Sequence, residues 1–269
     1  MPPAADATKP TSSAAAAPVE ARDLVRRFGG LRAVNGMSIA LQPGEMLGLI
    51  GPNGAGKTTL FNLIAGSLKP TSGSIRISGE EVSAEGPERR IARGLGRTFQ
   101  IPRPFPEMTV LENVLTGGQR QAGEHIWKNF LQPGRVAAEE KAAVDRARAL
   151  LDFVTLSGLE SEPARVLSGG QRKLLELARI LMADPATVLL DEPAAGVNPT
   201  LLEIIIDRVL ELNARGKSVL LIEHNMEMVA RLCRRVVVMA AGRHLAEGPP
   251  AEVARNPAVI EAYLGGVAA

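Results

Sequence analysis

The sequence predicts an α/β fold built on a mainly parallel sheet, and two observations carry this prediction. First, three apolar segments of strand length, residues 46–50, 187–190 and 218–222, are each followed by polar or glycine-rich residues. Second, segments with the length and apolar spacing of helices lie between them. Strands that alternate with helices pair in parallel, and ligands gather at the carboxyl ends of such strands. We therefore expect one ligand site where these three strands end.

The composition agrees with a soluble enzyme. With 269 residues, 45% of them hydrophobic, the chain can fill a sizeable core. Its formal charge of +2 gives no reason to expect a nucleic-acid partner. The single cysteine, Cys233, excludes an intrachain disulfide and suits a reducing compartment. No apolar run approaches the roughly 20 residues that a membrane-spanning helix needs, so any membrane spans would come from other chains.

The amino-terminal part predicts a tail followed by an antiparallel β region. Residues 1–18 are rich in Ala, Pro, Ser and Thr and lack the apolar core of a secretory signal, so we expect a disordered tail. Residues 19–41 predict two strands joined at 28–30, and Pro43-Gly44 predicts the turn into the next strand.

Residues 51–58, Gly-Pro-Asn-Gly-Ala-Gly-Lys-Thr, match a complete phosphate-binding loop between a strand and a helix. The glycines let successive backbone N–H groups point at an anion, and the helix N-terminus adds its positive dipole. Lys57 can reach the β- and γ-phosphates, and the Thr58 hydroxyl can bind Mg²⁺. A chance glycine-rich turn is the alternative, which the full match in this context disfavours. The candidate nucleotide-binding residues here are Gly51, Pro52, Asn53, Gly54, Ala55, Gly56, Lys57, Thr58 and Thr59.

Residues 101–166 predict a mainly helical subdomain inserted into the α/β core. The prolines within 101–106 exclude a regular helix or sheet interior, because each lacks a backbone donor. Thr109 is placed to cap a short helix that ends at residue 115, and residues 137–154 have helical apolar spacing. The core would comprise residues 19–100 and 167–269.

The other segments continue the alternation of strands and helices. The sequence predicts a strand at 74–78, helices at 87–93, 172–182 and 199–215, a hairpin of 235–240 with 244–247, and further helices from residue 249 onward.

The polar residues that end the apolar strands offer the chemistry of phosphate hydrolysis. Asp191 can hold Mg²⁺, and Glu192 beside it can accept a proton from an attacking water molecule. His224 ends the neighbouring strand and can hydrogen-bond the γ-phosphate or that water. Gln100 can sense the metal or the water. The plain alternatives are a solvated carboxylate for Glu192 and a structural histidine for His224.

A second anion site is indicated by Leu-Ser-Gly-Gly-Gln at residues 167–171. This segment offers a serine hydroxyl, glycine N–H groups and a helix N-terminus, although a helix cap alone would also explain it. One chain therefore carries two candidate phosphate-binding surfaces that are far apart in the sequence. The candidates in the second are Ser168, Gly169, Gly170 and Gln171.

The order of these motifs resembles the ATP-binding-cassette (ABC) ATPases from about residue 19 to the C-terminus, and residues 167–171 are the most specific element. The resemblance implies that the ligands are ATP and Mg²⁺ and that the Phe28 ring stacks on adenine. It implies that Glu192 is the catalytic base, His224 the switch histidine and Gln100 the Q-loop residue. The residues that the resemblance implies in catalysis are Glu192, His224, Lys57 and Gln100. Those that it implies in metal binding are Thr58, Gln100 and Asp191.

The same resemblance implies a head-to-tail dimer, in which each 167–171 segment closes over the ATP of the partner. The helical subdomain would touch a membrane partner. One departure from the common pattern is Asn198, where many relatives have Asp, and this leaves the contact of that loop across the dimer open.

A narrower resemblance indicates the ATPases of branched-chain amino-acid uptake systems. It rests on residues 28–34, 59–62, 97–100, 108–114, 221–226 and 256–265. Such systems combine two ATPase subunits, either a homodimer or a pair of sisters, with two hydrophobic permeases and a solute-binding protein. The resemblance implies an ATPase at the cytoplasmic face of the inner membrane, whose solute is chosen by the other subunits. Similar proteins also serve amides, urea or aromatic acids.

Three other classes are weighed against this interpretation. The ATPase of a lipopolysaccharide exporter looks alike, but residues 223–226 and 256–265 favour uptake. Soluble ABC proteins of ribosomes or DNA repair usually carry two cassettes or zinc-type cysteines, and this chain has one cassette and one cysteine. A kinase or GTPase would leave residues 167–171 unexplained, and no guanine-reading Asn-Lys-x-Asp motif is present.

Overall fold

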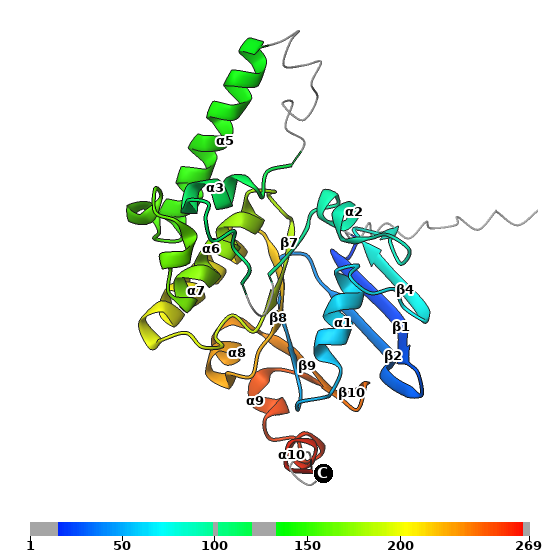
Figure 1. The fold of residues 1–269 in the computed structure, drawn as a ribbon. Coiled ribbons are helices and arrows are strands. Elements are labelled where there is room, and N and C mark those ends of the chain that lie inside the picture. Colours follow the sequence, from blue (N-terminus) through cyan, green and yellow to red (C-terminus); the bar gives the residue numbers. More distant parts are fainter. Residues whose placement is uncertain (1–15, 99–101, 120–132, 266–269) are drawn as a thin grey trace, which may run out of the picture.

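The computed structural model describes residues 16–98, 102–119 and 133–265, in which two sheets lie beside a group of helices (Figure 1). The predicted mainly parallel sheet is confirmed. It has six strands in the order β10-β9-β3-β8-β7-β6, and within these residues β10 runs antiparallel to β9 while the other pairs are parallel. The order places β3, β8 and β7 side by side, so their carboxyl ends meet. The strands are β3 (Met46–Ile50), β6 (Leu95–Arg97), β7 (Thr187–Asp191), β8 (Ser218–Ile222), β9 (Arg235–Ala240) and β10 (Arg243–Gly248).

The second sheet is antiparallel and has the order β2-β1-β4-β5. The predicted pair of strands at residues 19–41 is confirmed. The strand predicted at 74–78 begins earlier, because its pairing with β1 extends to Val25 and Ser72. The strands of this antiparallel sheet are β1 (Val19–Phe28), β2 (Leu31–Leu41), β4 (Ser72–Ile77) and β5 (Glu80–Glu81).

The helices follow the predicted order with a few differences at their ends. Thr109 caps α3 as predicted, and its hydroxyl accepts the N–H of Glu112. α6 begins at Gly169, earlier than the predicted residue 172, because Ser168 caps it. α8 and β6 were not predicted, since segments this short show no clear periodicity. The helices are α1 (Lys57–Ile64), α2 (Pro87–Ala92), α3 (Val110–Leu115), α5 (Pro133–Phe153), α6 (Gly169–Leu181), α7 (Pro199–Ala214), α8 (Met226–Leu232), α9 (Pro250–Val253) and α10 (Pro257–Gly265), with 3₁₀ turns η2 (Ser157–Leu159) and η3 (Ala164–Val166).

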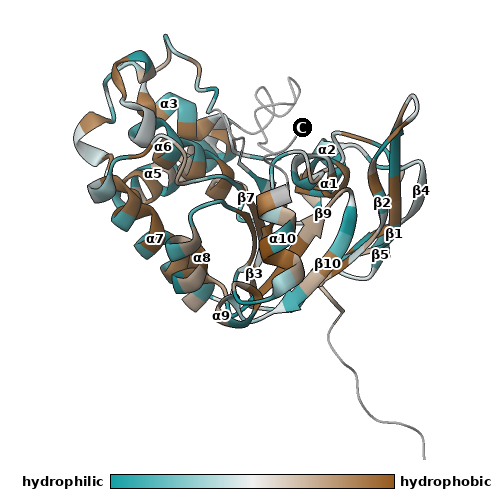
Figure 2. Cartoon of the chain, turned by 90° about the horizontal axis from the view of Figure 1, so that it is seen from below, coloured by the Kyte–Doolittle hydropathy of each residue, from teal (hydrophilic) through white to brown (hydrophobic). Residues whose placement is uncertain are grey.

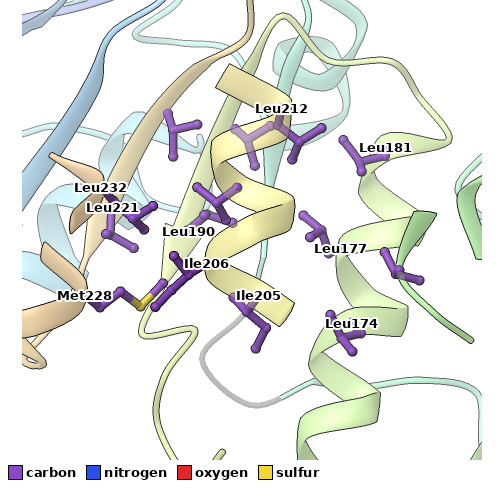
Figure 3. Close-up of a cluster of buried hydrophobic side chains, with 14 of the residues drawn as sticks. Leu174, Leu177, Leu181, Leu190, Ile205, Ile206, Leu212, Leu221, Met228 and Leu232 are labelled. Atoms are coloured by element: carbon purple, nitrogen blue, oxygen red, sulfur yellow. The ribbon is translucent and has the colours of Figure 1, made fainter. Parts of the chain in front are cut away.

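Both faces of the parallel sheet are buried, which explains why its strands are continuous apolar runs. Along β7, Leu190 belongs to one core cluster and Leu189 to the other, because successive side chains point to opposite faces. The first cluster includes α6, α7 and α8. Figure 3 shows Ile205, Ile206 and Leu212 of α7 between the leucines of α6 and those of the sheet. The second cluster lies between the parallel sheet, α1 and the antiparallel sheet.

The helical segments after residue 109 share the first of these clusters with the sheet. Val110 and Val114 of α3, and Ala147 and Leu151 of α5, are fully buried in it. Both helices contact α6, which carries the 167–171 segment at its start. No helix within residues 16–98, 102–119 and 133–265 is long and apolar enough to cross a bilayer. Residues 1–15 of the expected tail and 120–132 of the expected subdomain lie outside the described residues.

Candidate nucleotide site

The predicted site lies in a cleft of about 620 Å³ at the carboxyl ends of the central strands. Its walls come from the phosphate-binding loop, the β1–β2 turn, the loops after β7 and β8, and the β9–β10 turn. The lining residues are Phe28, Leu31, Arg32, Ala33, Asn53, Gly54, Ala55, Gly56, Lys57, Thr58, Thr59, Glu192, His224, Ala241 and Gly242. The sheet therefore gathers the predicted loop, carboxylate and histidine into one concave site.

Two glycines of the phosphate-binding loop are required by close backbone approach. Gly51 and Gly56 have φ values of 147° and 98°. A Cβ atom at Gly51 would lie 2.0 Å from the Met239 carbonyl oxygen, and one at Gly56 would lie 2.2 Å from that of Ala33. The loop is thus packed against the end of β9 on one side and β2 on the other, and α1 begins at the next residue.

Lys57 is only 5% exposed and lies in the mouth of the loop. Its Nζ donates hydrogen bonds to the carbonyl oxygens of Gly51 and Pro52 at 2.7 and 2.9 Å. Burial lowers the pKa of Lys57, and the charges of Glu192 and Asp191 oppose that shift. The ammonium group, the helix N-terminus and the exposed Thr58 hydroxyl face the same space, an arrangement that suits a chain of phosphates.

Asp191, at the end of β7, is buried behind the cleft and is 2% exposed. Its Oδ2 accepts a hydrogen bond from Arg97 Nη2 at 3.1 Å, and Arg97 Nη1 donates to Asn62 Oδ1 of α1 at 2.6 Å. Burial raises the pKa of Asp191, and Arg97 opposes that shift. Among the described residues, Asp191 Oδ1 has no hydrogen-bond partner. A buried carboxylate oxygen without a partner fits a magnesium ion or a water bound to it.

Glu192 has a left-handed backbone with a φ of 48°, which turns its carboxylate into the cleft. Its Oε1 lies 3.1 Å from His224 Nε2. The backbone N–H of Glu192 donates to the Ile222 carbonyl at 2.9 Å, and its own carbonyl accepts from Lys173 Nζ at 2.6 Å. The side chains of Glu192 and His224, which follow different strands, are therefore in direct contact. A carboxylate beside an imidazole can take part in proton transfer.

Glu223 joins the loops that carry these two residues; the sequence places it beside His224 at the end of an apolar strand but indicates no role for it. Its carboxylate is 3% exposed. Oε1 accepts the N–H of Ala194 at 2.6 Å, and Oε2 accepts those of His224 and Asn225 at 2.8 and 3.0 Å. Arg97 was also missed. For Glu223, the available signal was an acidic residue directly after a fully apolar strand. For Arg97, it was an arginine at the end of the short strand β6.

Phe28 lies at the rim of the cleft with 45% of its surface exposed. The Arg26 guanidinium lies 4.7 Å from the centre of its ring. The exposed part of the ring is suited to stacking on a planar base. Burial raises the pKa of Tyr263 in α10, and the nearby backbone of Gly51, the first residue of the phosphate-binding loop, opposes that shift. α10 lies beside β10 (Figure 2), with which it is in contact.

The remaining predicted residues lie elsewhere. The Ser168 hydroxyl accepts the N–H of Gln171 at 3.3 Å, and Gln171 Oε1 accepts the N–H of Ser168 at 2.9 Å, which forms a capping box. None of residues 168–171 is among those that line the cleft of their own chain. Gln100 lies outside the described residues. Asn198 caps α7, where its Oδ1 accepts the N–H of Leu201 at 2.9 Å.

Comparison with known proteins identifies relatives along nearly the whole chain. A family model described as "ABC transporter" matches residues 34–195, and one described as "Branched-chain amino acid ATP-binding cassette transporter" matches residues 243–269. A probable branched-chain amino acid transport ATP-binding protein of Archaeoglobus fulgidus is 39% identical, over 92% of this chain and 95% of its own. A high-affinity branched-chain amino acid transport ATP-binding protein of Pseudomonas aeruginosa is 40% identical, over 92% and 97%.

Solved structures agree with these matches. A nucleotide-free ATP-binding cassette from an ABC transporter is 37% identical, with a TM-score of 0.80 over 92% of this chain and 98% of that one. The ADP conformation of an ATP-binding cassette of an ABC transporter is 36% identical, with a TM-score of 0.79 over 93% and 99%.

Proposed function

Because this chain belongs to the ATP-binding proteins of ABC transporters, it hydrolyses ATP to power transport, and we propose that its transporter imports branched-chain amino acids. The names of its relatives and the family match over residues 243–269 support this solute class. Amides, urea and aromatic acids are the alternative solutes. The observation that carries the catalytic proposal is the contact between Glu192 and His224, 3.1 Å apart in the same cleft as Lys57.

The roles of the site residues follow from their positions. Residues 51–59 hold the phosphates of ATP, and Lys57 exchanges its contacts with loop carbonyls for contacts with the β- and γ-phosphates. Thr58, Asp191 and Gln100 would hold Mg²⁺, which when bound neutralises the negative charge on those phosphates. Glu192 accepts the proton of the attacking water, and His224 orients that water or the γ-phosphate. Phe28 stacks on adenine.

Residues 101–166 form the subdomain that contacts the permease. A groove of about 340 Å³ between α2, β6 and α6 supports this assignment. Arg179 of α6 lies in it, donates to the Arg103 carbonyl at 3.1 Å and lies 5.3 Å from the Phe105 ring. Phe105 and Met108 beside it are 47% and 40% exposed. This apolar and cationic surface suits a helical loop of a permease, which would hold the protein at the cytoplasmic face of the inner membrane.

The signature segment, residues 167–171, serves the nucleotide of a partner subunit in a head-to-tail dimer. Its capping box leaves the N-terminus of α6 exposed and outside the cleft of its own chain. The partner is a second copy or a sister ATPase, and a solute-binding protein would act through the permeases.

Uptake by the assembled transporter tests the solute class. The chain is expressed with its permeases and binding protein, purified in detergent and placed in vesicles with ATP inside. We expect labelled leucine or valine, but not urea, an amide or phenylalanine, to accumulate and to stimulate ATP hydrolysis. If a different class of compound accumulated, that class would replace branched-chain amino acids as the proposed solute. Failure to co-purify with any permease would favour a soluble ABC ATPase, and outward movement of lipopolysaccharide would favour an exporter.

A further inference from the structure

We propose that Lys173 is a positioning residue that ties the start of α6 to the backbone of Glu192, so that the signature segment of a chain sets the geometry of that chain's own catalytic carboxylate. The proposal rests on the roles proposed above for Glu192 and for residues 167–171. It concerns communication between the two ATP sites of a dimer.

The tie is a single hydrogen bond between two elements of the site. Lys173 lies in the second turn of α6, and its Nζ donates to the Glu192 carbonyl oxygen at 2.6 Å. The ammonium group is partly buried, and the charges of Glu223, Glu192, Glu176 and Asp191 attract it. Glu223, Glu192 and Asp191 lie at the strand ends, so they attract this cation towards the strands in addition to the hydrogen bond, whereas Glu176 lies on α6 itself.

Glu192 needs such support because its backbone is in an unfavourable region. A φ of 48° is uncommon for a residue with a Cβ, and it persists only where the surroundings hold it. Its N–H is held by the Ile222 carbonyl, and its carbonyl by Lys173 and the N–H of Ala195. Lys173 provides a side-chain hydrogen bond to this carbonyl, so it helps to fix the direction in which the Glu192 peptide, and hence its carboxylate, points.

The two sides of the Glu192 peptide are tied to different parts of the molecule. Glu223 binds the backbones of Ala194, His224 and Asn225, which makes the loops after β7 and β8 one unit with the sheet. Lys173 belongs instead to α6, whose first turn is stiffened by its capping box. A displacement of α6 relative to the sheet therefore changes the position of Glu192 against His224.

The consequence is a link between the two ATP sites of the dimer. When the partner's ATP draws the signature segment of this chain towards it, α6 moves as a rigid element and carries Lys173 with it. The Glu192 carboxylate then reaches the position from which it can accept a proton from the attacking water in its own ATP site. Closure of one site would thus prepare the other for hydrolysis, which gives positive cooperativity in ATP.

The test compares Lys173→Met and Lys173→Arg with the parent protein in the assembled transporter. We expect Lys173→Met to lower kcat by about 10- to 100-fold, because a misplacement near 1 Å costs about that much. The KM for ATP should change less than the kcat does, and the Hill coefficient should fall towards one. Lys173→Arg, which restores a donor, should recover much of both. Arg146→Met is the matched control, since it removes a similar bond, from Arg146 Nη2 to the Leu181 carbonyl at 3.0 Å, at the far end of α6.

Two further measurements separate positioning from damage. Lys173→Met should keep the Tm of the parent and its ATP affinity. If it does not, Lys173→Ser replaces it with the same expected kinetics, because serine keeps a polar group in the cluster but is too short to reach the Glu192 carbonyl. Parental kcat and cooperativity in either folded variant, or an equal loss in Arg146→Met, would overturn the proposal.

The proposed function is tested separately by Glu192→Gln. If that variant still hydrolyses ATP at the parental rate, the role of Glu192 is wrong, whatever Lys173 does. If Glu192→Gln is inactive and forms an ATP-dependent dimer, adding Lys173→Met should leave that dimer intact, because Lys173 acts on its own Glu192 and not on the partner's ATP.

Discussion

Three cations, each from a different element, hold separate parts of the acidic site in the described chain. Lys57 of α1 binds the carbonyls of the phosphate-binding loop, Arg97 of β6 binds Asp191, and Lys173 of α6 binds the Glu192 backbone. Each is at least partly buried, so each interacts with its neighbours through a medium that screens charge poorly. At the scale of residues, the site is a set of carboxylates and carbonyls kept in place by cations from three directions.

Lys57→Ala should weaken ATP binding by about 10- to 100-fold, because one charge-assisted hydrogen bond to phosphate contributes about 1.5 to 3 kcal/mol. Titration calorimetry with ATP measures the change. Lys141→Ala, on the exposed surface of α5, is the control and should bind ATP like the parent. Parental affinity in Lys57→Ala would mean that the loop is not the phosphate site.

Arg97→Met should lower the free energy of unfolding by about 3 kcal/mol, because it leaves the buried Asp191 carboxylate without its ion-pair partner. Urea unfolding measures the loss. The double variant Arg97→Met/Asp191→Asn should regain much of it, since the buried charge is then gone. Arg148→Met breaks the exposed pair with Glu160 and should cost less than about 1 kcal/mol. An equal cost for both single variants would contradict the buried ion pair.

At the scale of elements, the strands that carry the site are fully buried where the structure describes them. Every residue of β7 and β8 is buried, and their side chains alternate between the two core clusters. The polar residues that follow them are therefore anchored by rigid strands. The helices α1 and α6 pack on the same sheet and add Lys57 and Lys173 to the site.

Asn198 is the cap of α7, and this position should accept Asp but not Ala. Asn and Asp cap helices about equally well, so Asn198→Asp should change the free energy of unfolding by only a few tenths of a kcal/mol. Asn198→Ala should lower it by about 1 kcal/mol, because the N–H of Leu201 loses its acceptor. Urea unfolding compares the two. If Asn198→Asp costs as much as Asn198→Ala, the amide has a role beyond capping.

Changes in residues 101–116 should uncouple transport from ATP hydrolysis. Phe105→Ala with Met108→Ser removes exposed apolar surface beside the groove, and central contacts of this kind often contribute about 2 kcal/mol to an interface. We expect uptake to fall about tenfold, while the isolated subunit keeps its ATPase rate. Leu210→Ser, at a 39% exposed position of α7, is the control. Parental uptake in the double variant would exclude this surface as the permease contact.

At the scale of the whole molecule, one chain carries two surfaces suited to phosphate that do not meet. The cleft is lined by the phosphate-binding loop and the strand ends, and the signature segment lies on another element, outside that cleft. The helical segments share a core cluster with the sheet, so they cannot fold over their own cleft without breaking apolar packing. Two chains arranged head to tail would bring each signature segment to the other's nucleotide.

Glu192→Gln should form an ATP-dependent dimer, because it keeps the shape of the site but removes the base that ends the ATP-bound state. Adding Ser168→Arg should abolish the dimer, since a long cation at the helix start blocks its approach. Gel filtration with and without ATP measures both. Ser157→Arg, in the exposed turn η2, is the control and should leave the dimer unchanged. If the Ser168→Arg double variant also lost ATP binding as a monomer, the site would be completed within one chain.

The sequence by itself determined the class of fold, the phosphate-binding loop and the convergence of Asp191, Glu192 and His224. Those features are local: a buried strand is a continuous apolar run, and the polar residue that ends it is next to it in the chain. Roles in catalysis, metal binding and dimer contact remain predictions. Only the tertiary structure decided the order of the strands, the buried pair of Arg97 with Asp191, the clamp made by Glu223 and the bond from Lys173. Arg97 and Asp191 are 94 residues apart, and Lys173 and Glu192 are 19 apart. Such partners meet because strands and helices from distant segments pack on a shared core, and no local periodicity records which charges that packing brings together.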